Sequence, residues 1–182
     1  MESIDDEVLR KLDKGHTKAD FLDVVRLFRE QELNHSPTFI PFTPWTTWES
    51  YRELLRTVAE LDLVHQVAPV QLALRLLIPA GSRLMELEEI RSLVDAYQPD
   101  ALAHTWQHPD RTVDRLAARL LQLVDSEQKR GASRTECFAA IWAEAGGDEP
   151  APVLPPEQRR APRLSEPWYC CAEPMPERIA KV

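Results

Sequence analysis

The chain has 182 residues, of which 43% are hydrophobic, and a formal net charge of -8. It is therefore long enough for one sizeable core, and its acidic balance excludes a nucleic acid as partner. Because no apolar run approaches the roughly 18 residues of a membrane span, no signal-peptide pattern opens the chain and three cysteines form no disulfide framework, we expect a cytoplasmic protein that does not bind membranes.

The first half of the chain is expected to alternate helices and strands. Apolar spacing predicts a short helix over residues 5–13, and a capping pair of Thr17 and Asp20 begins a second helix that reaches about residue 32. Residues 36–42 are β-prone between prolines and predict a strand. Thr46 and Glu49 have capping-box spacing, which predicts a helix as far as residue 61.

Residues 67–82 predict a second strand with two different faces. Gln71, Ala73 and Arg75 alternate with a continuous apolar row, which consists of Val70, Leu72, Leu74, Leu76 and Ile78. The apolar face suits burial under helices, and the other face suits the lumen of a parallel barrel. Arg75 is therefore expected either to contact a ligand or to form half of a structural ion pair with a carboxylate.

The second half predicts helices over residues 85–97, 110–130 and 133–145, with an irregular segment at 99–109. Eight of the 15 prolines lie in residues 148–182, which predicts an extended tail. The expected fold is an α/β partial barrel fragment with about two parallel strands, followed by a helical pair and the proline-rich tail. We divide the chain into residues 1–98, 99–147 and 148–182.

Cysteines supply the reactive groups of the sequence. Cys170 and Cys171 are adjacent in the predicted tail, where they could act as a redox couple, a soft-metal clamp or a nucleophile that reaches a distant site. Cys137 lies on the apolar face of its predicted helix and is expected in the core. The sequence contains no phosphate-binding glycine loop and no paired-cysteine zinc motif.

Five segments together resemble a known family. They are Glu2-Ser3, Lys14-Gly15-His16-Thr17, Pro41-Phe42-Thr43-Pro44-Trp45-Thr46-Thr47, Arg75-Leu76-Leu77-Ile78-Pro79 with Gly81-Ser82, and Cys170-Cys171-Ala172-Glu173-Pro174. In these five segments the chain is similar to the C-terminal half of radical SAM proteins that end in a Cys-Cys-Ala-Glu-Pro or Cys-selenocysteine-Ala-Glu-Pro tail.

The resemblance implies a partial (β/α) barrel that binds S-adenosylmethionine and a 4Fe-4S cluster, and that cleaves S-adenosylmethionine reductively to a deoxyadenosyl radical. The family holds its cluster on a CxxxCxxC motif, which this sequence lacks. We therefore expect a chain that is inactive alone and that needs a separate chain carrying the N-terminal half of the barrel. The alternative is a non-catalytic remnant or interaction module with a redox or metal-binding dithiol tail.

The resemblance also implies roles for individual residues. Glu2 and Ser3 match a strand end that approaches the methionine or ribose part of the nucleotide. Gln71 and Arg75 match the lumen face of a later strand and are expected to bind cofactor or substrate. Cys170 and Cys171 are expected to be catalytic, with Cys171 in the place of selenocysteine. The substrate, a small molecule or a peptide, is not specified by the resemblance, and no metal ligand is expected within this chain.

Overall fold

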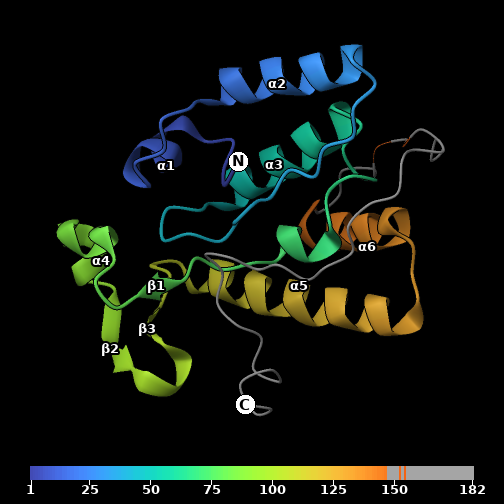
Figure 1. The fold of residues 1–182 in the computed structure, drawn as a ribbon. Coiled ribbons are helices and arrows are strands. Elements are labelled where there is room, and N and C mark those ends of the chain that lie inside the picture. The colour runs from blue at the N-terminus through green and yellow to red at the C-terminus, as the bar shows by residue number, and fades with distance from the viewer. Residues whose placement is uncertain (147–151, 153, 155–182) are drawn as a thin grey trace.

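A computed structural model describes residues 1–146, 152 and 154 (Figure 1). The longer helices are α2 (Lys18–Glu30), α3 (Trp48–Glu60), α5 (Arg111–Arg130) and α6 (Arg134–Gly146), and the shorter helices are α1 (Asp6–Lys11) and α4 (Glu88–Arg91). Three short 3-10 helices are η1 (Pro69–Leu72), η2 (Arg83–Glu86) and η3 (Pro99–Ala101). The strands are β1 (Ile78–Pro79), β2 (Val94–Gln98) and β3 (Ala103–Trp106). Cys170, Cys171 and the rest of the Cys-Cys-Ala-Glu-Pro segment lie outside the described residues.

Local sequence signals place most of the helix starts correctly. The Thr17 side chain accepts a hydrogen bond from the Asp20 backbone N–H, and the Asp20 carboxylate accepts one from Thr17, as the capping-box spacing predicted. Ser133 and Glu136 form the same reciprocal pair before α6. In α3 the prediction is wrong by one residue, because Thr47 rather than Thr46 is the N-cap.

The predicted parallel barrel fragment is wrong. The described residues contain one three-stranded antiparallel sheet in the order β1-β3-β2, with Ile78 paired to His104 and Tyr97 also opposite His104. The predicted strand at 36–42 does not form a ladder; it makes only an isolated parallel bridge between Phe42 and Arg75. The N–H groups that would extend this bridge belong to Ile40 and to residue 44, but Ile40 donates to the Glu2 carbonyl at 2.9 Å and Pro44 has no N–H, which limits the pairing to a single bridge.

The predicted strand at 67–82 is broken into three pieces. Pro69 begins η1, Arg75 lies in the isolated bridge, and only Ile78 and Pro79 form β1. The residues on both sides of the alternation are buried, Gln71 and Ala73 as well as the apolar row. Gln71 and Ala73 therefore lie in the protein interior and do not face a lumen.

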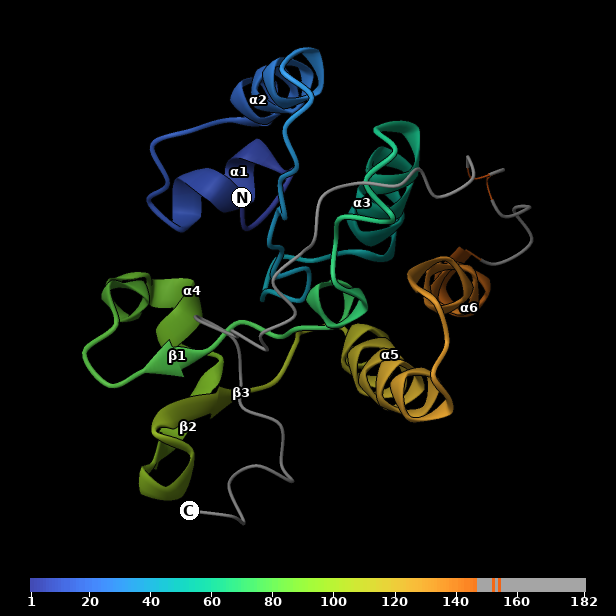
Figure 2. The same ribbon diagram turned by 45° about the vertical axis from the view of Figure 1, so that its right-hand side comes forward.

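The segment after η2 also differs from prediction. The helix expected over 85–97 is replaced by the single turn of α4 and by β2, and β3 lies inside the segment expected to be irregular. β2 and β3 pair with each other, so non-local pairing overrides the local helical pattern. Figure 2 shows this sheet apart from the long helices.

Buried side chains form two clusters. The larger cluster combines residues of α2, α3, η1, α5 and α6, including Leu55, Leu120 and Ile141. The smaller cluster lies at the sheet and consists of Ile40, Leu76, Ile78, Ile90 and Trp106. Among the described residues, none of the helices is both long and apolar enough to cross a lipid bilayer.

Candidate functional site

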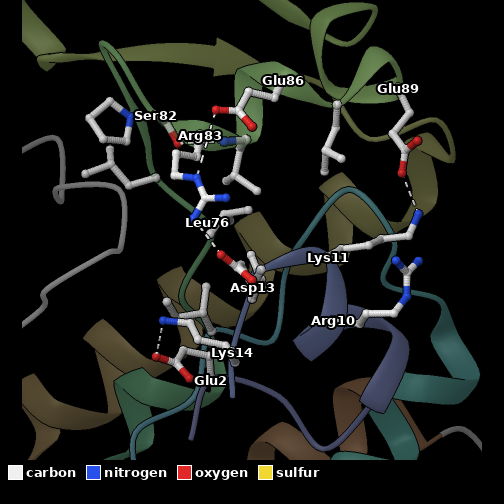
Figure 3. A pocket seen from close by; sticks show the side chains of 16 residues that line it. Glu2, Arg10, Lys11, Asp13, Lys14, Leu76, Ser82, Arg83, Glu86 and Glu89 are labelled. Carbon is white, nitrogen blue, oxygen red and sulfur yellow. Dashed lines mark hydrogen bonds and ion pairs between the residues drawn. The ribbon is translucent and has the colours of Figure 1, made fainter. Parts of the chain in front are cut away.

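A cavity of about 750 Å³ lies beside the smaller core cluster (Figure 3). Its walls come from α1 and the turn after it on one side, from η2 and α4 on the other, and from the chain around Ile40 and Leu76. This volume falls within the roughly 300–1,000 Å³ range of small-molecule sites. The lining residues are Glu2, Arg10, Lys11, Leu12, Asp13, Lys14, Ile40, Leu76, Leu77, Pro79, Ser82, Arg83, Leu84, Glu86, Leu87 and Glu89.

Segments that carry the family resemblance meet at this cavity. Glu2 comes from the first motif, Lys14 from the second, and Leu76, Pro79 and Ser82 from the fourth. The first two motifs flank α1 and are close in the sequence, whereas α2 and α3 separate them from the fourth. The fold therefore brings the N-terminal motifs together with one distant motif.

Glu2 is the predicted nucleotide-binding residue that lines the cavity. Its Oε1 lies 2.7 Å from Lys14 Nζ, and its Oε2 lies 3.8 Å from His16 Nε2. Burial raises the pKa of Glu2, but the hydrogen bond and positive charge of Lys14 outweigh burial and leave that pKa below its ordinary value. Oε2 and His16 Nε2 are both buried without a hydrogen-bond partner among the described residues. The two atoms face each other 3.8 Å apart, just beyond hydrogen-bond distance, so His16 is the ion-pair partner of Oε2 within the chain.

Ser3 lies beside Glu2 but has a local structural role. Its Oγ accepts a hydrogen bond from the Asp5 backbone N–H at 3.1 Å, and Asp5 in turn caps α1. Ser3 lines a separate small cavity of about 20 Å³ that it shares with Glu2. That space is large enough for about one water molecule.

Gln71 and Arg75 do not line the large cavity in the described part of the chain. Gln71 Oε1 accepts a hydrogen bond from the Phe39 backbone N–H at 3.1 Å. Arg75 forms an ion pair with Asp114 at 2.6 Å, donates to the Trp106 carbonyl and stacks on the Trp106 ring at 4.1 Å from its centroid. Of the two alternatives for Arg75, the structure contains the ion pair, and a ligand-binding role for either residue stays a prediction.

The residues that close the cavity carry no recognisable signal in the sequence. Lys11 on α1 forms an ion pair with Glu89 on α4 at 2.5 Å and lies over the Trp45 ring, whose Nε1 also donates to Glu89. The Lys11 hydrogen bond is the main cause that lowers the pKa of Glu89. A second pair joins Arg83 on η2 to Asp13 after α1 at 2.5 Å. Figure 3 shows both pairs reaching from one wall to the other.

The described residues do not fit a 4Fe-4S cluster. No three His, Cys, Asp or Glu side chains within this part of the chain come together as metal ligands. Cys137 is buried in the helical region, as expected for a core residue, and burial raises the pKa of its thiol. A thiol in that state is a poor metal ligand, and Cys170 and Cys171 lie outside the described residues.

Comparison with known proteins adds no assignment, since no protein-family model matches the chain and neither a curated protein nor a solved structure is significantly similar to it.

Proposed function

We propose that this chain provides the nucleotide- and substrate-binding part of a radical SAM enzyme. The observation that carries the proposal is the convergence of three resemblance motifs, through Glu2, Lys14 and the segment from Leu76 to Ser82, on one cavity of about 750 Å³. Residues that come together from distant segments around a cavity are typical of a binding site rather than of a surface pattern.

S-adenosylmethionine fits the Glu2 end of the cavity by chemistry. Its ribose hydroxyls and its ammonium group are hydrogen-bond donors, and Glu2 is an ionised acceptor residue in the lining of the cavity. Lys14 pairs with Oε1, which keeps Glu2 ionised, and His16 Nε2 lies 3.8 Å from Oε2, so both neighbours fix the orientation of the carboxylate. When bound, S-adenosylmethionine supplies the radical chemistry, while Glu2 and Lys14 bind and orient it.

The cluster belongs to a second chain in this proposal. The sequence has no CxxxCxxC motif and the described residues form no metal site. A separate chain with that motif, together with this one, would complete the enzyme, and its substrate is a small molecule or a peptide. We place the protein in the cytoplasm, because three cysteines, two of them adjacent, are poorly suited to a disulfide framework.

Titration with S-adenosylhomocysteine, an unreactive analogue, tests the proposal. Calorimetry on the full chain should give saturable binding, and Glu2→Gln should weaken it about tenfold, since the ionised acceptor contributes a charge-assisted hydrogen bond. Glu7→Gln is the matched control, because Glu7 lies on α1, pairs with Arg10 and does not line the cavity. Absence of saturable binding, or an equal effect of both substitutions, would refute the proposed function.

A further inference from the structure

Part of the cavity lining is aliphatic, and binding of the nucleotide by Glu2 does not explain it. These side chains come from the turn after α1, from the segment between α2 and α3, from the chain before β1, and from η2 and its end. We define the aliphatic wall by its residues, which are Leu12, Ile40, Leu76, Leu77, Leu84 and Leu87. From this wall and the charges beside it, we infer that the cavity takes a long-chain aliphatic zwitterion as substrate.

The aliphatic wall favours an alkyl chain as the part of the substrate that contacts it. The cavity is lined by no aromatic side chain in the described part of the chain, so its apolar contacts are aliphatic. Ile40 and Leu76 are buried in the smaller core cluster, and Leu84 and Leu87 pack against it while remaining partly exposed. An alkyl chain that covers these groups would gain free energy with each methylene removed from water.

The charges around the cavity are balanced. Four lining residues are cationic and four are anionic, so the formal charge of the lining is zero. These are Arg10, Lys11, Lys14 and Arg83 against Glu2, Asp13, Glu86 and Glu89. Such a lining has no net attraction for a ligand of either sign, and it argues against a phosphorylated substrate.

Each lining cation also has a carboxylate partner already. Lys11 pairs with Glu89, Lys14 with Glu2, Arg83 with Asp13 and Arg10 with Glu7. A phosphate would have to displace a carboxylate and leave it unpaired, which costs free energy. A zwitterion can instead insert into an ion pair, so that its cation contacts the acid and its anion contacts the base.

The Arg83–Asp13 pair is the one best placed to accept the head group. Both side chains are mostly exposed, at 75% and 72%, so the bond between them contributes little to stability and opens at small cost. Leu84 follows Arg83 in the chain and lines the same cavity. A head group between Arg83 and Asp13 would therefore direct its chain along the aliphatic wall.

Three probes on the unmodified full chain test the ligand class by calorimetry, all below their micelle-forming concentrations. Lauroylcarnitine carries a zwitterionic head and a twelve-carbon acyl chain, acetylcarnitine has the same head with a short chain, and dodecyl phosphate has a similar chain with an anionic head. We expect one lauroylcarnitine per chain, bound at least about tenfold more tightly than either of the others. Equal affinity for acetylcarnitine, or equal or tighter binding of dodecyl phosphate, would overturn the inference.

Substitutions in η2 and at its end locate the bound chain. Leu84→Gln combined with Leu87→Gln should weaken lauroylcarnitine about tenfold, since both side chains line the cavity. Met85→Gln is the control, because Met85 packs on the same core cluster but does not line the cavity, and it should change the affinity less than about twofold. An equal loss in the control would place binding elsewhere and overturn the inference.

The inference rests on the proposed function only in taking this cavity as the substrate site. The binding experiments can refute the proposed function and the inferred substrate class separately. If the chain does not bind S-adenosylhomocysteine but binds lauroylcarnitine as expected, only the proposed nucleotide role is refuted. Binding of S-adenosylhomocysteine without preference for lauroylcarnitine refutes the substrate class alone.

Discussion

At the scale of single residues, Arg75 shows how a partly buried cation is paired within the chain. Its guanidinium bonds Asp114 at 2.6 Å and the Trp106 carbonyl at 2.9 Å, and the side chains of Arg75 and Asp114 are each 20% exposed. Replacing Arg75 with Ala should lower the free energy of unfolding by about 2 kcal/mol, because Asp114 loses its closest charged partner in a partly buried site. Urea unfolding followed by circular dichroism measures this change.

Arg111 provides the matched comparison for Arg75. Its guanidinium lies 3.6 Å from the same Asp114 carboxylate, but its side chain is 61% exposed. Arg111→Ala should therefore cost less than about 0.5 kcal/mol. If the two substitutions lower the free energy of unfolding equally, the Arg75 ion pair does not stabilise the fold, and the ligand-contact alternative for Arg75 gains support.

At the scale of elements, two adjacent threonines at the start of α3 have different structural roles. Thr46 is buried; its Oγ1 donates to the Pro41 carbonyl at 2.6 Å and accepts from the Thr43 backbone N–H at 2.9 Å. Thr47 is the N-cap, and its Oγ1 accepts from Ser50 N at 3.0 Å. Thr46→Val should cost about 2–3 kcal/mol, because it leaves two buried backbone groups unsatisfied, whereas Thr47→Val should cost about 1 kcal/mol.

Urea unfolding of both threonine variants checks that order, and the reverse order would mean that the cap sets the geometry of the turn. The sequence predicted a capping box here but placed it one residue early, because Thr46-x-x-Glu49 matches the pattern better than Thr47-x-x-Ser50. The hydrogen bond from Thr46 to Pro41 depends on how the chain folds back. No local spacing could reveal it.

Helices were predictable from the sequence where their signals were local, and strands were not. The pairs Thr17 with Asp20 and Ser133 with Glu136 lie within one turn, so the sequence alone identifies them. β3 forms only because β1 and β2 lie on either side of it, which is information from distant segments. For the same reason, Glu2 could be named as a site residue by resemblance, whereas Arg83 and Glu89 became visible only in the folded chain.

At the scale of the whole molecule, the two core clusters suggest two units of different stability. The larger cluster joins five helical elements, whereas the smaller contains Ile40, Leu76, Ile78, Ile90 and Trp106. The two meet along the chain at Leu74 and Leu76, which belong to different clusters, and through the Arg75–Asp114 ion pair. Because fewer apolar contacts hold the smaller unit, it should open locally at a lower free energy than the larger one.

Hydrogen exchange with mass spectrometry can test this division with two cavity-forming substitutions. Ile90 and Leu120 are both fully buried, in the smaller and the larger cluster respectively, and truncation of either to Ala should cost about 2–5 kcal/mol. Ile90→Ala should accelerate exchange in β1, β3 and α4 and leave α5 unchanged, while Leu120→Ala should accelerate exchange throughout. Equal acceleration of α5 by Ile90→Ala would show one cooperative unit. The wall of the cavity formed by η2 and α4 could then not open without unfolding the helices, and ligand entry would have to proceed through the exposed Arg83–Asp13 pair alone.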